Sequence, residues 1–412
     1  MSIFLGAKGG DILAWRSVVE LVKGLQGTIG AGMANLLPRD ELLILQGIQE
    51  KLDQELAEEQ LFATAFADLV NELERADFED ELPGIQERFS TLAAKYFQNR
   101  GSVLALNSLT TSFQDALVRK ILLLAERSAE PASPGLSRDS YCCFIGDAAG
   151  RREQTLWAAC EFFLIYRDAD SSTAPFFDKL AYRIMATMKG CGLMDSPADT
   201  PPLRRLWRGP VDAWRTWLTD EYGQGGEHRL ELLSRIADLR AITGDGTLSS
   251  EIHKLIKEFL RIDPSSETTR HWARKGVGMP VALGLFGGFR VERTGRFRGC
   301  FDLEQYALAP LVMNVRILAT GFWISASGTI DRIRGLQSAG RISVDLAERL
   351  LMSFHGLVRL KARLEMSSAG KRAGLYFNPD TLTEAERHDL KASLELVVNL
   401  QKLVHQAFLE YV

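Results

Sequence analysis

The sequence contains little of what would place it in several large classes of protein. Its 412 residues include only five cysteines, an odd number, which excludes a disulfide-stapled scaffold and predicts a reducing, cytoplasmic location. Lys and Arg number 49 against 53 Asp and Glu, a formal net charge of -4. Proteins that bind nucleic-acid backbones are usually basic. Nucleic acid is therefore disfavoured as a partner.

Long apolar runs are also missing. The most apolar stretch, 307–324, is interrupted by Pro310, Asn314 and Arg316. No segment reaches the roughly 20 apolar residues that a transmembrane helix needs. The first ten residues lack the basic, apolar and small-residue order of a signal peptide. We therefore expect no membrane association.

Two catalytic signatures are absent as well. The six histidines have no His-x-x-x-His spacing and the cysteines no Cys-x-x-Cys spacing, which disfavours a zinc site. A Gly-x-Ser-x-Gly turn, typical of serine hydrolases, is missing too. Zinc chemistry and serine-based hydrolysis are therefore not expected.

Helical patterning dominates both ends of the chain. Apolar residues such as Phe66, Leu69 and Leu73 recur at helical spacing, and they predict a helical N-terminal region over residues 1–98. Near the other end, Thr383 and Glu386 form a capping-box pattern before a long apolar stripe. Segments rich in Ser and Pro at 128–140 and 262–266 suggest linkers. We predict a middle domain over 99–262 and a helical C-terminal domain over 263–412.

In the middle of the chain, the spacing of apolar residues changes from helical to short continuous runs. Residues 141–145 and 162–166 are short apolar runs rich in aromatics, and turn residues bound both of them. Such runs are typical of buried strands. The sequence therefore predicts an α+β fold, mostly helical, with a small mixed-sheet domain between helical ends.

The turn after the first of these runs could bind an anion. It contains Gly146 and Gly150, and Arg151 and Arg152 follow at once. A strand that breaks at a glycine turn and opens a helix presents free backbone amides, and arginines can pair with phosphate oxygens. Most such turns are only turns, so by itself this pattern is a weak signal.

The same stretch, Gly150-Arg151-Arg152-Glu153-Gln154-Thr155-Leu156, carries a resemblance to a known family. It resembles the bacterial nucleotidyltransferases related to PII-protein uridylyltransferase, in the polymerase-beta-like superfamily. The resemblance implies nucleotide binding at the turn and two Mg2+ ions held by an Asp-x-Asp pair and a third carboxylate. The nucleotide-binding positions that it implies are Gly146, Gly150, Arg151, Arg152 and Glu153.

Later motifs extend the resemblance towards the C-terminus. Asp238-Leu239-Arg240 is similar to the segment of the family that contains the third carboxylate. Asp302, Arg316 and Arg332 are similar to positions of the helical substrate-binding domain appended to these enzymes. The resemblance implies that these three residues belong to the substrate domain.

The sequence departs from the family at its metal ligands. Six residues after Glu153, where the family has its first Asp, stands Ala159, and Glu161 stands at the second. Alanine cannot ligate a metal through its side chain, and Mg2+ requires clustered oxygen ligands. Glu161 and Asp238 are left as the candidate catalytic residues and metal ligands.

Three hypotheses follow from these residues. In the first, the chain is an enzyme that transfers a nucleoside monophosphate from a nucleoside triphosphate to an acceptor, which the resemblance suggests is a PII-type signalling protein. In the second, the fold has lost its metal site and acts as a nucleotide-sensing or partner-binding regulator in signal transduction. The N-terminal helices would then carry a partner contact, such as that of a homodimer. A purely structural helical scaffold is the third and weakest hypothesis.

Overall fold

The fold combines long helices with one small sheet. The computed structural model describes residues 38–129, 140–157, 160–167, 174–194, 208–219, 234–260, 266–284, 287–367 and 375–410. Within these ranges the chain is mostly helical and contains a mixed four-stranded sheet. The predicted α+β, mostly helical class is confirmed.

Three helices form the N-terminal part from Pro38 onwards, where the structure describes it. They are α2 (Pro38–Arg75), α3 (Leu82–Arg100) and α4 (Val103–Ala129), with the short 3-10 turn η1 (Glu79–Glu81) between the first two. Their shared core combines aliphatic and aromatic side chains, and the rings of Phe89 and Phe113 stack with their centroids 3.9 Å apart. The helical pattern predicted from Phe66 and its neighbours is confirmed where the residues are described.

The sheet has the strand order β3-β2-β1-β4. Its strands are β1 (Tyr141–Gly146), β2 (Glu161–Tyr166), β3 (Arg208–Pro210) and β4 (Arg240–Gly244). β1 is antiparallel to both β2 and β4, whereas β2 and β3 are parallel. The predicted strand pair is therefore confirmed.

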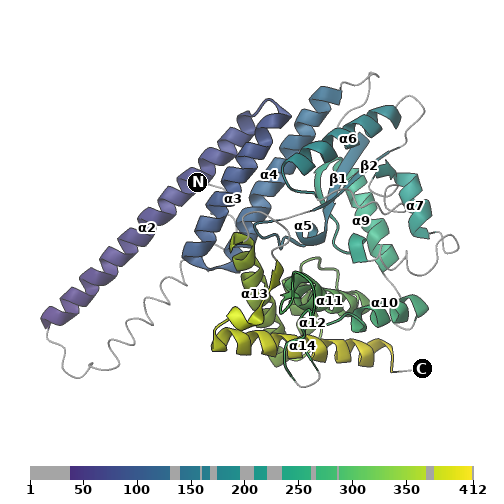
Figure 1. Ribbon diagram of the computed structural model, residues 1–412. Helices are drawn as coiled ribbons and strands as arrows, with labels where there is room; N and C mark the ends of the chain where they lie inside the picture. The colour runs from purple at the N-terminus through teal and green to yellow at the C-terminus, as the bar shows by residue number, and fades with distance from the viewer. Residues whose placement is uncertain are drawn as a thin grey trace.

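Helices cover both faces of this sheet (Figure 1). Cys143 and alternate strand residues pack into the large core with α4 and α6 (Ala174–Gly190). Cys142 and the residues of the opposite parity pack against α7 (Val211–Thr219) and α9 (Gly246–Leu260). Because both faces are covered, the central strand is apolar at every position rather than alternating.

The C-terminal part is a helical bundle. It contains α10 (Glu267–Val277), α11 (Ala309–Gly321), α12 (Thr329–Ser338), α13 (Val344–Ser367) and α14 (Glu384–Phe408). A π-helical turn, η4 (Glu304–Leu308), precedes α11, and a 3-10 turn, η6 (Pro379–Thr381), precedes α14. The two-residue strands β5 (Phe301–Asp302) and β6 (Tyr376–Phe377) pair antiparallel. The predicted capping box is confirmed, because Thr383 and Glu386 satisfy each other's backbone amides.

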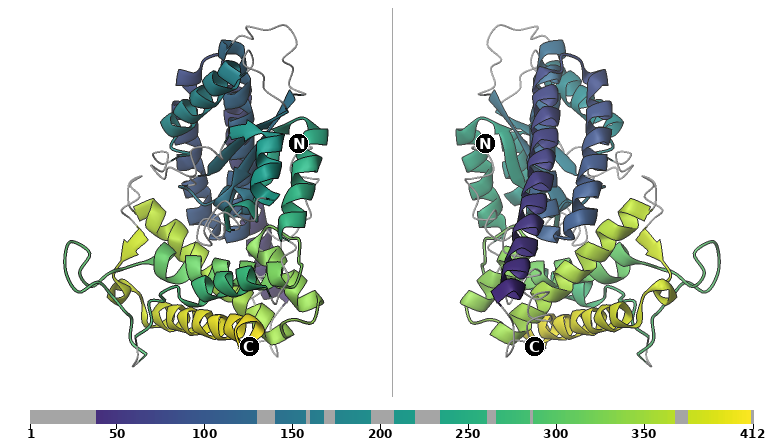
Figure 2. Two further views of the ribbon diagram at one scale, coloured as in Figure 1. Left: turned by 90° about the vertical axis from the view of Figure 1, so that its right-hand side faces the viewer. Right: turned by 90° about the vertical axis from the view of Figure 1, so that its left-hand side faces the viewer.

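The short helix α5 (Asp147–Arg151) lies where the two halves of the molecule meet. It follows β1 at the end of the sheet that faces the C-terminal bundle, and Figure 2 shows the same stacking of the two halves from both sides. Among the described residues, no helix is long and apolar enough to cross a membrane. The domain boundaries at 98 and 262 stay predictions.

Candidate functional site

One glycine sets the shape of the turn after β1. A Cβ atom on Gly150 would lie 1.9 Å from the carbonyl oxygen of Asp238 and 3.0 Å from that of Ile145. No other residue fits at this distance. Gly146 is less constrained, because its nearest neighbour would be 3.3 Å away. Gly150 therefore brings the backbone of α5 directly against the segment that precedes β4.

Two left-handed residues flank the same turn. Asp147 has a φ of 55° and Arg152 a φ of 59°. Such conformations are unfavourable for residues other than glycine and occur where the surroundings over-determine them. The carboxylate of Asp147 also lies in the first turn of α5, the position that a bound anion would take. Phosphate binding by the amides of Gly146 and Gly150 stays a prediction.

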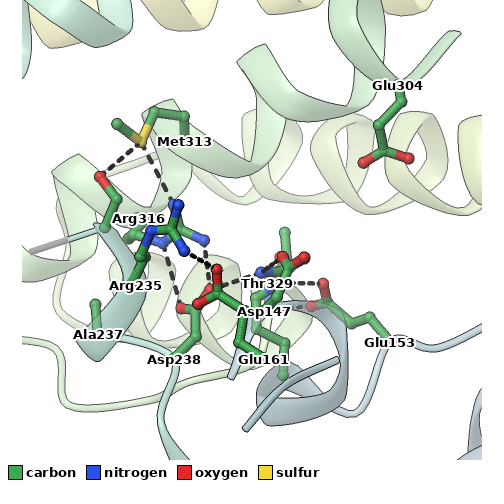
Figure 3. Close-up of polar contacts among 12 residues, drawn as sticks. Asp147, Glu153, Glu161, Arg235, Ala237, Asp238, Glu304, Met313, Arg316 and Thr329 are labelled. Carbon is green, nitrogen blue, oxygen red and sulfur yellow. Dashed lines mark hydrogen bonds and ion pairs between the residues drawn. The ribbon is translucent and has the colours of Figure 1, made fainter. Parts of the chain in front are cut away.

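The two candidate metal ligands lie at the same end of the sheet. Glu161 begins β2 and is paired in register with Gly146, the last residue of β1. Asp238 comes two residues before Arg240, whose register partner is Ile145. Figure 3 shows both carboxylates on the same side of the site, and guanidinium groups approach both of them. The sheet therefore does bring the two predicted acids to one place.

Asp238 is surrounded by arginines. We call Arg151, Arg316 and Arg332 the arginine cluster. Oδ1 of Asp238 lies 3.2 Å from Nε of Arg316 and 2.8 Å from Nη1 of Arg332. Oδ2 lies 2.6 Å from Nη1 of Arg151 and also accepts from Nη2 of Arg316. Each carboxylate oxygen thus already has two cationic partners.

The ionisation of this group follows from its neighbours. Asp238 is completely buried, and burial by itself would raise its pKa, but the charges of Arg316, Arg332 and Arg151 together lower that pKa well below its usual value. Burial lowers the pKa of Arg332, and repulsion from Arg316 adds to this effect although Asp238 opposes it. Asp238 is therefore a fixed negative charge that keeps buried arginines compatible with the fold.

Other predicted residues take different places around the cluster. Glu153 accepts from Nε of Arg151 at 2.7 Å and from the backbone amide of Thr329 at 2.5 Å, so it links the turn to the start of α12. Arg152 is exposed and stands outside the cluster. Asp302 lines a cavity beside Arg151, and its Oδ1 accepts from the amide of Gln305 at 3.0 Å.

A cavity of about 320 Å³ opens beside the arginine cluster, between α5 and the C-terminal bundle. One part of its wall is apolar and the other is charged, and Arg151 connects the charged part to the cluster. The apolar wall is formed by Trp157, Leu308, Val312, Phe354, Val358 and Leu375. The charged wall is formed by Asp147, Arg151, Glu153, Asp302, Glu304, Lys361 and Glu365. A volume of this size lies within the range of small-molecule sites.

Two charged residues of α13 face this cavity. Nζ of Lys361 lies 2.7 Å from Oε2 of Glu304, which Figure 3 shows apart from the arginine cluster. The carboxylate of Glu365 accepts from the hydroxyl of Thr155 at 2.8 Å and from the amide of Leu156 at 2.9 Å. Burial raises the pKa of Glu365 to about 7. These contacts of Glu365 fix the segment 155–156, which follows Glu153, to the C-terminal bundle.

The residues present do not fit a Mg2+ ion well. Mg2+ needs several oxygen ligands with accessible lone pairs, but the oxygens of Asp238 are taken by guanidinium groups, and Glu161 is paired with Arg235. Within the described ranges, no three His, Cys, Asp or Glu side chains are grouped to hold a metal. Ala159 lies outside the described residues. The assignment of Glu161 and Asp238 as metal ligands stays a prediction, and the arginine contacts count against it.

Sequence analysis missed three residues of this site. Arg235 lies three residues before Asp238, a spacing that would place them near each other in a helical turn. Lys361 and Glu365 continue the buried stripe of α13 that contains Phe354 and Val358. Lys361 and Glu365 are charged residues at core positions of an amphipathic helix, and this pattern is the signal that could have identified them.

Comparison with known families supports the resemblance in its general form. Residues 87–227 match the family described as Putative nucleotidyltransferase DUF294, and residues 266–408 match the Putative nucleotidyltransferase substrate binding domain. No curated protein matches the chain. The first match includes α5 and most of the sheet, the second includes α10–α14, and Asp238 lies between them. The relation to PII-protein uridylyltransferase and the loss of the metal motif stay predictions. Two consecutive parts of the chain are thus similar to a nucleotidyltransferase domain and to its associated substrate-binding domain.

Proposed function

We propose that the chain binds a nucleotide between its two halves and acts as a nucleotide-sensing regulator rather than as a metal-dependent transferase. The observation that carries this proposal is the arginine cluster around Asp238. A carboxylate that already contacts three guanidinium groups is a poor metal ligand. The same three cations are, however, well suited to phosphate.

The cavity supports a nucleotide in one orientation. Trp157 and Phe354 lie on its apolar wall, where a base can pack. Carboxylates such as Asp302 and Glu304 can accept hydrogen bonds from ribose hydroxyls, but they repel phosphate. The phosphates are therefore expected at the end formed by Arg151, which leads to the arginine cluster.

Transfer of a nucleoside monophosphate is the second candidate. The observation in its favour is that Glu161 and Asp238 come to the same end of the sheet as the turn. In this candidate the acceptor, which resemblance suggests is a PII-type signalling protein, would displace pyrophosphate from the α-phosphorus. Ala159, at the position of the first ligand, and the pairing of Glu161 with Arg235 weaken it.

One experiment separates the two candidates. The full chain is titrated with each nucleoside triphosphate, in Mg2+ and in EDTA, while thermal stability and pyrophosphate release are measured. The regulator hypothesis predicts stabilisation in both buffers and no pyrophosphate release. Mg2+-dependent release that disappears in Glu161→Gln would establish the transferase instead. Asp178→Asn, whose carboxylate pairs with Arg208 away from the cavity, is the matched control.

A further inference from the structure

The arginine cluster is assembled from three separate elements around one carboxylate. Arg151 comes from α5, Arg316 from α11 and Arg332 from α12. All three side chains are at least nine-tenths buried. Among the described residues, Asp238 is the one carboxylate within ion-pair distance of Arg316 and Arg332. Two buried guanidinium groups thus depend on a single negative charge, which Arg151 shares.

One donor in the cluster is incompletely satisfied. Nε of Arg332 donates to the carbonyl of Ala326, and Nη2 donates to the carbonyl of Ala237, each at 2.9 Å. Nη1 lies 2.8 Å from Asp238 but forms no hydrogen bond of good geometry within the described part of the chain. Buried polar atoms are normally hydrogen-bonded, so this one points to a missing acceptor. A carboxylate has two oxygens, whereas a terminal phosphate has three and more negative charge.

We infer that the arginine cluster is a phosphate site, and that Asp238 occupies it as an internal competitor which the phosphate of a bound nucleotide displaces. The inference rests on the proposed function, because it takes the nucleotide in the neighbouring cavity as the source of the phosphate. No covalent step is involved. One anion replaces another on the same three cations, and the third oxygen of the phosphate accepts from Nη1 of Arg332.

The exchange couples ligand binding to the contact between the two halves of the molecule. Asp238 belongs to the segment that leads into β4, whereas Arg316 and Arg332 belong to the C-terminal bundle. Displacement of Asp238 therefore removes two of the ion pairs that hold the segment 234–240 against α11 and α12. Because linkage is reciprocal, the ion pairs of Asp238 must weaken phosphate binding by the same factor.

This inference and the metal-ligand hypothesis predict opposite effects of the same substitution. Asp238→Asn removes the competing charge, so the affinity for inorganic triphosphate in EDTA should increase about tenfold or more, since loss of a charged hydrogen-bond partner exceeds about 1.4 kcal/mol. Affinity for the unphosphorylated nucleoside should not change. If Asp238 were a metal ligand, the variant would bind Mg2+-nucleotide more weakly and triphosphate in EDTA no better.

The matched control is Asp245→Asn. Asp245 is also an aspartate beside β4, and its Oδ2 lies 2.6 Å from Nη2 of Arg167, but it is at the opposite end of the strand. Removal of this ion pair should leave triphosphate affinity unchanged. Unchanged or weaker binding by Asp238→Asn, compared with this control, would overturn the inference.

A second measurement uses the unmodified chain, because Asp238→Asn leaves the buried Arg316 and Arg332 without a carboxylate, which can prevent folding of the variant. Amide hydrogen exchange is measured with inorganic triphosphate and, separately, with nucleoside. Triphosphate should accelerate exchange in the segment 234–240, and nucleoside should not. Nucleotide binding with no acceleration there overturns the inference but leaves the proposed function intact. Failure to bind any nucleotide or triphosphate overturns both.

Discussion

Gly150 shows how closely the turn and the sheet approach each other at the scale of single residues. A methyl group at this position would overlap the carbonyl oxygen of Asp238. We expect Gly150→Ala to lower the free energy of unfolding by roughly 3 kcal/mol, because the backbones must separate. Chemical denaturation measures this change.

The control for this substitution is another helical glycine. Gly356 lies inside α13, and no atom would lie within 4 Å of an added Cβ. Gly356→Ala should therefore raise the free energy of unfolding by up to about 1 kcal/mol, the difference in helix propensity. Equal effects of the two substitutions would show that the close approach at Gly150 is unimportant.

Glu365 gives the fold a pH dependence that can be measured. Its pKa is raised from 4.5 to about 7 by burial, so between these values the folded chain binds more protons than the unfolded chain. Stability from this residue is therefore present at low pH and decreases as pH rises from about 4.5 to 7. At pH 8 the contribution of Glu365 to the free energy of unfolding has fallen by an amount on the order of 3 kcal/mol.

The substitution Glu365→Gln tests the direction of this pH dependence of stability. Glutamine keeps an acceptor for the amide of Leu156 and carries no charge. Thermal unfolding followed from pH 4.5 to 8 should show a smaller decrease in stability for the variant than for the unmodified chain. A parallel pH dependence of the two proteins would contradict the assignment of a raised pKa to this glutamate.

At the scale of elements, apolar pattern predicts the strand pair but not the site. The runs that became β1 and β2 are buried on both faces, so their composition alone identified them. β3 has only three residues, and its partner is far away in the chain, which leaves no local pattern to recognise. A strand this short is stabilised mainly by pairing with a neighbouring strand, so the sequence pattern does not predict it.

The sequence identified several residues of the site but did not predict which of them contact one another. Asp238, Arg316 and Arg332 were each identified, but as members of separate motifs with separate roles. Their meeting depends on how α11 and α12 pack against the end of the sheet, and no spacing along the chain encodes that packing. A carboxylate expected to bind metal is instead contacted by arginines from three other elements.

The helix α2 leads to a prediction about assembly. Its N-terminal half extends beyond the rest of the molecule (Figure 1). Leu52 and Leu56, four residues apart and thus on one side, are 42% and 57% exposed. We expect this stripe to pair with α2 of a second copy, because exposed apolar stripes on long helices are typical of coiled-coil contacts.

Light scattering coupled to size exclusion tests the assembly. The full chain should elute as a dimer, and the double substitution Leu52→Glu and Leu56→Glu should make it a monomer. Leu104→Glu on α4, where the leucine is also exposed, should leave the dimer intact. A full chain that is monomeric at all concentrations would contradict this role of α2.

At the scale of the whole molecule, the two halves share one hydrophobic core and are also joined by a set of polar contacts. Asp238 contacts α11 and α12, Glu153 accepts from the start of α12, and Glu365 of α13 holds the chain after Glu153. Polar junctions of this kind respond to competing ions more readily than apolar ones do, because each contact can be exchanged for another charged partner. The cavity lies at this junction, so a bound nucleotide can act on both halves.

The metal dependence of nucleotide affinity tests the central claim most directly. Calorimetric titration of the full chain with nucleoside triphosphates compares binding in EDTA with binding in Mg2+. If arginines hold the phosphates, affinity in EDTA should equal or exceed that in Mg2+, since Mg2+ neutralises the charge that the arginines recognise. Binding that requires Mg2+ and is lost in EDTA would contradict the account.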